Sequence, residues 1–249
     1  MPIMLSLVIS DFHGSVEMLD PLEKMINESD LDVIFFCGDI VKGHKRGNEW
    51  LAAKAENRTP NREKLGIITE KDEDIMYYKK FYDFLDRTNI KVFTIPGNMD
   101  APESLYFETL WRLKKKNINL AHELIYFMED FALCGFGGEI NEDEREDFFV
   151  LKYTRDETFF ALRKLAYLKK DFVLLTHTPP VCTFDDGRGS TVVNEIIKRY
   201  KPKFLFCGHS HQQGKEKIEE TIVVNPGALK NGNYATVDLK TGEVRLKSL

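Results

Sequence analysis

Cysteine is scarce in this sequence, and its copies follow no pairing pattern. Only four cysteines occur in 249 residues, and no two have the Cys-x-x-Cys spacing of a zinc knuckle or a redox motif. Three of them stand directly before a glycine at the end of an apolar run. We interpret all four as small buried side chains of a protein from a reducing compartment, which excludes a disulfide-stapled secreted domain. They are Cys37, Cys134, Cys182 and Cys207.

Long apolar runs and an excess of positive charge are also lacking. No apolar stretch approaches the roughly 18 residues that cross a bilayer, and no basic segment with a cleavage site precedes the first predicted strand. We therefore expect a cytoplasmic protein with no membrane partner. Its 35 Lys and Arg against 40 Asp and Glu give a formal net charge of −5. This balance argues against nucleic acid as a partner, and it leaves a homo-oligomer open.

The hydrophobic content is sufficient for one large domain. Hydrophobic residues make up 43% of the chain and aromatic residues 12%, which is enough to bury a core without disulfides. No internal repeat, low-complexity tract or linker interrupts the sequence. We predict a single domain over residues 1–249, with an inserted excursion at about 42–90 that is basic at first and helical later.

Predicted helices and strands alternate in the manner of an α/β fold. Strand 3–10, helix 15–28 and strand 32–38 form a βαβ unit, whose strands should be parallel neighbours. Later strands are predicted at 91–95, 172–176 and 204–207, preceded by helices at 70–87, 155–168 and 190–200. Shorter strands are predicted at 124–127, 132–134 and within 215–249, and helical pieces at 48–57 and 102–116. The acidic segment 139–147 is predicted to be a solvated loop without function.

Five of the apolar runs end on residues that can bind a metal. Buried strands read as continuous apolar runs, and open α/β sheets place ligand sites beyond the carboxyl ends of their strands. We therefore expect one shared metal site with Asp39 at its middle. The residues at the strand ends are Asp11, His13, Asp39, Asn98, His177, His209 and His211.

This set of side chains favours two metal ions over one. Two carboxylates, one amide oxygen and four imidazoles are too many ligands for a single structural zinc, and no thiolate is among them. Mixed nitrogen and oxygen donors suit Mn, Fe, Zn, Co or Ni. Two ions about 3.5–4 Å apart need a bridge, and a carboxylate with two oxygens is the natural one.

The order of these motifs resembles a known family. Asp11-x-His13, Gly38-Asp39, Gly97-Asn98, a lone His177 and Gly208-His209-Ser210-His211 resemble, in order, the signature of the calcineurin-like metallophosphoesterases. Asn225-Pro226-Gly227-Ala228 is similar to the turn that follows the last motif in small bacterial and archaeal members. Each motif alone is weak, but five in the right order, each at the end of an apolar strand, make a strong signal.

The resemblance implies a fold and a mechanism. The fold would be a four-layer αββα sandwich of the α/β class, with two mixed β-sheets face to face. Asp11, His13, Asp39 and His211 would hold the first ion, and Asp39, Asn98, His177 and His209 the second, with manganese the ion that we favour. A hydroxide bridging the ions would attack a phosphodiester, or a small nucleotide or phosphomonoester. Asp39 and Asn98 would thereby also act in catalysis.

The chain departs from the family pattern after Gly-Asn. Where the family often has a histidine that assists the leaving group, this sequence has Met99. Methionine cannot donate a proton, so the change predicts a leaving group that needs less acid, or a donor from elsewhere. His44 is a candidate donor, although a surface histidine is its default interpretation. The family pattern implies that Asp100 orients a metal ligand, a histidine in our interpretation, without binding the ion itself.

Substrate contacts are expected from basic residues near the motifs. Residues 42–64 carry seven Lys and Arg against three Glu and directly follow Asp39, so they are a candidate lid. Lys42 and Arg46 in this stretch, and Arg188 in the turn 185–190, are candidate phosphate contacts, with solvated surface as the default. His122 is interpreted as structural, and Phe12 and Phe184 as core residues that could instead line the pocket.

Two other functions compete with a phosphodiesterase. A nuclease acting on DNA or RNA ends would need a basic groove, and only residues 42–64 resemble one. A metal-binding scaffold or interaction protein with a weakened active site is the alternative outside enzymology. Met99 is the only feature in its favour, because all seven candidate ligands are present.

Overall fold

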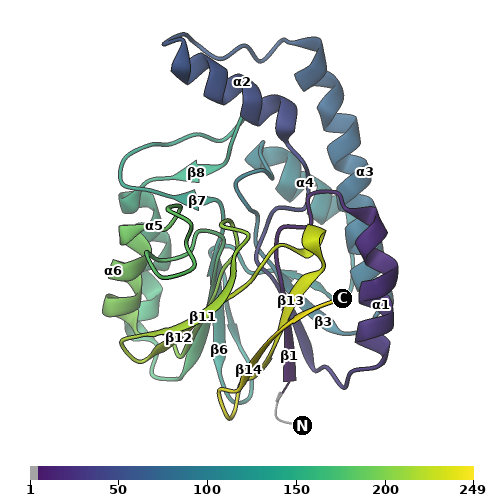
Figure 1. Ribbon diagram of the computed structural model, residues 1–249. Coiled ribbons are helices and arrows are strands. Elements are labelled where there is room, and N and C mark those ends of the chain that lie inside the picture. The colour runs from purple at the N-terminus through teal and green to yellow at the C-terminus, as the bar shows by residue number, and fades with distance from the viewer. Residues whose placement is uncertain (1–4) are drawn as a thin grey trace.

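Two six-stranded β-sheets lie face to face at the centre of the molecule (Figure 1). The computed structural model describes residues 5–249. The first sheet has the strand order β14-β13-β1-β2-β3-β4. Its strands are β1 (Leu5–Ile9), β2 (Val33–Phe36), β3 (Lys91–Thr94), β4 (Ile118–Leu120), β13 (Asn233–Asp238) and β14 (Val244–Ser248).

The second sheet has the order β11-β12-β10-β9-β6-β5. Its strands are β5 (Ile125–Phe127), β6 (Ala132–Phe136), β9 (Phe172–Thr176), β10 (Phe204–Phe206), β11 (Gln213–Ile218) and β12 (Thr221–Pro226). Both sheets are mixed. In the first sheet β1 to β4 are parallel and β13 runs antiparallel to β1. In the second sheet β6, β9, β10 and β12 are parallel, and the edge strands β5 and β11 are antiparallel to their neighbours. A separate pair joins β7 (Glu139–Ile140) to β8 (Lys152–Tyr153).

Helices cover both outer faces of the double sheet. On the first sheet lie α1 (Leu19–Asn27), α3 (Leu65–Arg87) and α4 (Glu103–Leu113), and on the second lie α5 (Arg155–Leu162) and α6 (Thr191–Tyr200) (Figure 1). The helix α2 (His44–Ala55) stands apart at the top of the view. Short 3₁₀ turns occupy Val16–Met18, Arg163–Tyr167 and Leu229–Asn231. The predicted four-layer αββα sandwich is therefore confirmed.

The core between the sheets explains why the central strands read as apolar runs. Phe35 of β2 packs against Phe93 of β3 and, across the interface, against Phe206 of β10, with ring centroids 6.2 and 5.4 Å apart. The opposite faces of the same strands pack against helices, so the side chains on both faces of each strand are buried. A strand that is buried on both faces therefore reads as an almost continuous apolar run until it ends.

Several element boundaries differ from the prediction. Helix α2 starts at His44 rather than near residue 48, and α3 starts at Leu65 rather than 70, so the excursion is mostly helical. The strand β4 and the pair β7–β8 were not predicted, because each of these strands contains at most two apolar residues and leaves no apolar run in the sequence. Residues 3 and 4 of the first predicted strand lie outside the described residues. Within residues 5–249, none of the helices is both long and apolar enough to cross a bilayer.

Candidate metal centre

The carboxyl ends of the parallel strands bring the seven predicted residues to one edge of the double sheet. Two groups of side chains present ligand atoms within 4.8 Å of one another: Asp11, His13 and His211 form one, and Asp11, Asp39 and His177 form the other. Asn98 and His209 complete the arrangement on the side of His177. Strands from both sheets contribute, so the centre spans the interface between the two halves of the chain.

The ligand atoms are spaced as they would be around bound ions. Two ligands that each lie about 2.1 Å from one ion are about 3.0–3.4 Å apart at angles of 90–109°. Asn98 Oδ1 is 3.0 Å from both His177 Nε2 and His209 Nδ1. The other separations are 3.1 Å between His13 Nε2 and His211 Nε2, 3.3 Å between His211 Nε2 and Asp11 Oδ1, and 3.4 Å between His177 Nε2 and Asp39 Oδ2.

Backbone carbonyls determine which nitrogen of two histidines faces the centre. His177 Nδ1 lies 2.7 Å from the Cys37 carbonyl, and His13 Nδ1 lies 3.2 Å from the Val41 carbonyl. A carbonyl only accepts, so each Nδ1 carries a proton and Nε2 is the nitrogen that faces the centre. Metal binding requires that Nε2 be deprotonated, and it then presents a lone pair. For His13 that lone pair faces the carboxylates of Asp11 and Asp39 at 3.7 and 3.6 Å. Lone pairs directed at anions call for a cation between them.

Burial and neighbouring charges shift the pKa values at the centre in opposite directions. Burial disfavours the charge on His177, but the adjacent Asp39 carboxylate outweighs it and raises the pKa of His177 to about 9. Burial and the positive charge at His177 lower the pKa of His209 to about 3. Burial by itself would raise the pKa of Asp11, yet hydrogen bonds from His13 and His211 hold it well below its usual value. These shifts follow from two buried carboxylates that attract positive charge.

The backbone at the strand ends is strained. Asp11, Asp39 and His209 have φ of 57°, 66° and 68°, and His13 and His211 are also in the left-handed region. Non-glycine residues adopt this conformation at a cost of about 1–3 kcal/mol each, and such residues cluster at functional sites. The neighbouring glycines permit close approach, since a Cβ at Gly208 would overlap the hydroxyl of Ser10. Glycine is therefore required at this motif position, because a side chain there would overlap its neighbours.

Asp100 supports the centre through backbone amides and not through a histidine. Its carboxylate accepts hydrogen bonds from the N–H groups of Asp39 at 2.9 Å, Ile40 at 2.9 Å and Gly97 at 2.7 Å. Tyr78 Oη on α3 also donates to it, at 3.2 Å. The expected histidine partner was wrong. The physical reason is that Asp100 is fully buried beneath the strand-end loops, where unpaired N–H groups are the donors within reach.

Met99 packs against the start of the inserted excursion. Its N–H donates to Asp39 Oδ1 at 2.7 Å. A Cβ at Gly47 of α2 would lie 3.1 Å from the Met99 methyl group, so the methyl group and α2 are in close contact. The position of the family histidine is thus used here for apolar packing.

The basic residues of the excursion lie in different environments. Arg46 is only 2% exposed and is ion-paired to Glu70 and Asp74 of α3, with Nη1 3.0 and 2.6 Å from their oxygens. It is therefore a buried structural residue, and its predicted role as a phosphate contact was wrong. Lys42 Nζ lies 5.1 Å from the centre of the Tyr77 ring, and His44 is an exposed residue at the first position of α2.

The outer part of the excursion is attached to the predicted acidic loop. Trp50 of α2 stacks on Phe149 with centroids 6.1 Å apart, and Arg62 lies 4.4 Å from the centre of the Phe148 ring. Lys54 of α2 is ion-paired to Glu144. The acidic segment is therefore not simply solvated, because part of its charge binds the basic stretch.

Arg188 lies at the edge of the candidate metal centre. Its Nη1 donates to the carbonyl oxygen of His209 at 3.2 Å, and its side chain is otherwise exposed. It lines a cavity of about 530 Å³ together with His209, the loop that begins at Glu139 and the start of α6. Of the three basic residues predicted to contact substrate, Arg188 is the one beside a candidate ligand.

Sequence reasoning missed the groups that hold the loops in place. Asn225 donates through Nδ2 to the Gly208 carbonyl at 2.8 Å and to Ser210 Oγ at 2.9 Å. The N–H groups of Leu229 and Lys230 donate to the carbonyls of Ser10 and Asp11. The Asn-Pro-Gly-Ala turn was the available signal, although it did not reveal which loops it would contact.

Three residues interpreted as structural are core residues. His122 is buried among aromatic rings and accepts a hydrogen bond from the Gly137 N–H at 2.8 Å, and burial lowers its pKa to about 3. Phe12 stacks on Phe81, and Phe184 is buried in the core of the second sheet. The four cysteines are free thiols, as expected. Cys37, Cys134 and Cys207 are buried, whereas Cys182 is only half-buried, so the prediction of burial was wrong for that residue.

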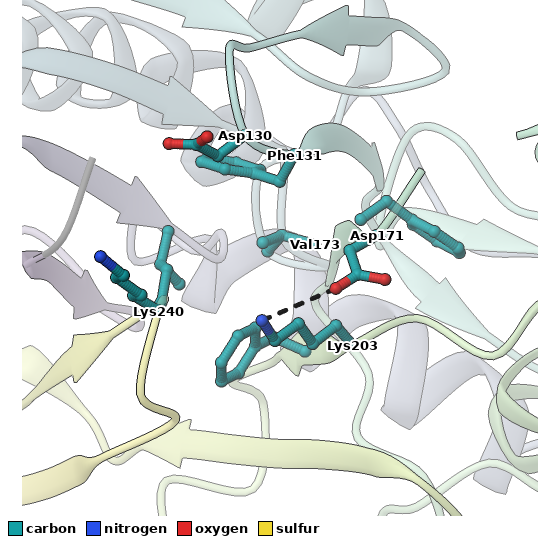
Figure 2. A pocket seen from close by; sticks show the side chains of 9 residues that line it. Asp130, Phe131, Asp171, Val173, Lys203 and Lys240 are labelled. Atoms are coloured by element: carbon teal, nitrogen blue, oxygen red, sulfur yellow. Dashed lines mark ion pairs between the residues drawn. The ribbon is translucent and has the colours of Figure 1, made fainter. Parts of the chain in front are cut away.

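Another cavity lies at the opposite edge of the double sheet (Figure 2). It has a volume of about 320 Å³ and lies beside Phe172 and Phe204, the first residues of β9 and β10. Its charged residues include Lys203 and Asp171, which form an ion pair at 3.6 Å. The parallel strands begin here, so this cavity is remote from the ligands at their carboxyl ends.

Comparisons with known proteins agree with the geometry. A family model described as metallophosphoesterase, calcineurin superfamily, matches residues 3–249. One solved crystal structure has 31% identity, a TM-score of 0.91 and 99% coverage of both chains. The protein TT1561 of Thermus thermophilus has 22% identity, a TM-score of 0.79 and 99% coverage of both chains. A novel archaeal phosphodiesterase has 14% identity and a TM-score of 0.50, with 99% of this chain and 100% of that chain covered.

Among curated proteins, none matches this chain significantly. The solved structures below 25% identity support the fold alone. The family model spans nearly the whole sequence and agrees with the order of the strand-end residues. The chain belongs to the calcineurin superfamily of metallophosphoesterases.

Proposed function

We propose that this protein is a dinuclear-metal phosphoesterase that hydrolyses phosphodiesters of small molecules. The observation that carries the proposal is the convergence of nitrogen and oxygen lone pairs on one another. His177 Nε2 faces Asn98 Oδ1 at 3.0 Å, and His13 Nε2 faces two carboxylates. Family membership supports phosphoester hydrolysis, and the donor set supports divalent ions.

The residues divide into two sets around a shared carboxylate. Asp11, His13, Asp39 and His211 would hold one ion, and Asp39, Asn98, His177 and His209 the other, with Asp39 as the bridge. Asp39 Oδ2 is 3.6 Å from His13 Nε2 and 3.4 Å from His177 Nε2, which supports this central place. The donors are nitrogen and oxygen atoms without thiolates, and Mn²⁺ is the ion that we favour.

Two bound divalent ions would supply Lewis acidity toward the phosphate oxygens and a nucleophile from water at neutral pH. The chain's own residues hold this arrangement rigid. Met99 N–H fixes Oδ1 of Asp39 at 2.7 Å and thereby directs Oδ2 toward the histidines. The N–H of His209 donates to both oxygens of Asp11, at 3.1 and 3.3 Å. Such preorganised contacts need no rearrangement when charge develops in the reaction.

Met99 bears on the leaving group of the substrate. It contributes no acid to that group, and its methyl group packs against α2. Esters with poor leaving groups therefore have no proton donor at this position, whereas an ester with an activated leaving group needs none. His44 remains a candidate donor from the first turn of α2.

The experiment that tests the function compares two chromogenic esters. The protein is stripped of metal, reconstituted with Mn²⁺, and assayed with bis-p-nitrophenyl phosphate and p-nitrophenyl phosphate. We expect faster turnover of the diester and loss of both activities with EDTA. Bound metal without turnover of either ester, with Mn²⁺, Ni²⁺ or Co²⁺, would instead support the metal-binding scaffold.

A further inference from the structure

We propose that the cavity beside His209 is a subsite for the organic part of the substrate, and that it selects a hydroxyl-rich group such as a sugar or the ribose of a nucleoside. The inference rests on the proposed function, because the cavity adjoins the candidate metal centre at His209. Its volume of about 530 Å³ lies within the range of small-ligand sites.

One wall of the cavity is the turn before α6, which is internally braced. Asp185 accepts hydrogen bonds from the N–H groups of Cys182 and Gly187, at 3.1 and 2.8 Å. The N–H of Arg188 donates to the Asp185 carbonyl at 2.9 Å, and the Arg188 guanidinium is tied to the His209 carbonyl. The turn therefore presents Arg188 at a defined place next to the metal centre.

The facing wall is the loop after β7, which is braced in the same way. Asn141 Oδ1 accepts from the N–H groups of Asp143 and Glu144, at 3.1 and 2.6 Å, and Nδ2 donates to the Glu144 carbonyl at 2.9 Å. Glu142 lies within this turn and lines the cavity. Asx turns of this kind fix the backbone without help from a ligand.

Two opposite charges line this cavity without pairing. Within residues 5–249, neither Arg188 nor Glu142 has an ion-pair partner within 4.0 Å, although both line the same space. Glu139, the other acid of the lining, is already neutralised by Lys152 Nζ at 2.8 Å. The cavity thus offers one cation, one anion and a balanced charge to a ligand.

This balance identifies the chemistry of the ligand. Arg188, next to His209, suits a phosphate oxygen. Glu142 accepts a hydrogen bond from Thr191 Oγ1 at 2.8 Å through Oε1, so its other oxygen remains an acceptor for hydroxyl groups. Among the described residues, no Phe, Tyr or Trp lines the cavity, which disfavours a stacked base or a quaternary ammonium group.

The test uses two nucleoside esters that differ only in their hydroxyl groups. The probes are the p-nitrophenyl esters of uridine 5′-monophosphate and of its 2′,3′-dideoxy counterpart, assayed on the Mn²⁺-loaded protein. We expect Glu142→Ala to lower kcat/KM for the ribonucleoside ester about tenfold or more, since it removes hydrogen bonds to a charged acceptor, and to leave the dideoxy ester unchanged. Asp143→Ala, an exposed neighbour in the same loop, is the matched control and should change neither.

Equal kcat/KM for the two esters in the unaltered protein, or an equal loss for both in Glu142→Ala, would overturn the subsite. A calorimetric measurement separates this failure from failure of the proposed function. If no ester is hydrolysed, the Kd of uridine 5′-monophosphate is measured for the Mn²⁺-loaded forms of both variants and compared. Weaker binding to Glu142→Ala than to Asp143→Ala supports the subsite without catalysis, and equal binding excludes it.

Discussion

The two ends of the double sheet have opposite chemistry. At the carboxyl ends of the strands, buried carboxylates and imidazoles face one another, and five of the seven candidate ligands have strained backbone. At the amino ends, the cavity of about 320 Å³ is lined by Phe131, Phe172 and Phe204, and Lys203 is paired with Asp171 (Figure 2). The difference shows that converging lone pairs and backbone strain, rather than the enclosure of a cavity, identify the functional end of this fold.

The largest effect is expected from changing the proposed bridge at the carboxyl end. Asp39→Asn keeps the size of the side chain but removes the charge shared by both ions. We expect loss of Mn²⁺-dependent turnover by more than about 100-fold, because removing a ligand should exceed the 10- to 100-fold effects of its supporting partners. Circular dichroism should show a folded protein. Full activity in this variant would contradict the assignment of Asp39 as a bridge.

A second variant tests the support beneath the ligands. Asp100→Asn places an amide where a carboxylate now accepts from the N–H groups of Asp39, Ile40 and Gly97. We expect Mn²⁺ affinity, measured by calorimetry, to fall about 10- to 100-fold. Tyr78→Phe removes one donor to the same carboxylate and should have a smaller effect. Unchanged affinity in Asp100→Asn would show that the strand-end loops hold their shape without it.

Substitution of Arg46 should lower the stability of the protein, whereas substitution of Arg188 should weaken substrate binding. Arg46→Ala leaves Glu70 and Asp74 buried without their partner, at 2% and 1% exposure, so we expect a loss of about 3–5 kcal/mol in the free energy of unfolding. Arg188→Ala should leave that free energy within about 0.5 kcal/mol and raise KM for phosphate esters. Denaturant titration and steady-state kinetics on both variants check the contrast. A higher KM for Arg46→Ala with unchanged stability would reverse the assignment.

His122, a buried histidine outside the candidate metal centre, should make the stability of the fold depend on pH. The aromatic surroundings of His122 give it a folded-state pKa of about 3, whereas an unfolded histidine has a pKa near 6.5. Below about pH 6.5 the unfolded state therefore binds the extra proton, and stability falls by about 1.4 kcal/mol per pH unit from this residue alone. The stability of His122→Asn, measured by denaturant unfolding between pH 7 and 4, should depend less steeply on pH. An identical slope in both proteins would mean that other groups set the acid sensitivity.

The smallest effect is expected at the amino end. Lys203→Ala breaks the pair with Asp171, but both side chains are substantially exposed, at 40% and 69%. Such a pair contributes less than about 1 kcal/mol, and its cavity is far from the candidate ligands. We expect kcat, KM and Mn²⁺ affinity to be unchanged. A clear loss of activity would show that the two ends of the sheet are coupled.

The candidate metal ligands could be predicted from the sequence, because their positions follow from local patterns of apolar and polar residues. Each ligand directly follows or closely follows an apolar run, and a run that ends on a polar residue marks the end of a buried strand whatever the tertiary context. The same logic predicted a structural role for His122, since no strand-end motif surrounds it. The roles of Arg46 and Asp100 were not predictable in this way, because their partners lie on α3 and on four separate backbone amides.

The family, the order of the strands that carry candidate ligands and the chemistry of the donor atoms can all be read from the amino-acid sequence. These follow from residue types and spacings along the chain. Only the packing of the folded chain shows which charges are neutralised. Arg46 is buried between two acids, whereas Arg188 lies beside the candidate metal centre without an ion-pair partner among the described residues. The physical reason is that an ion pair forms between groups that are close in space. The residues that neutralise a charge therefore depend on how helices and loops pack. The spacing of residues along one segment does not encode that packing.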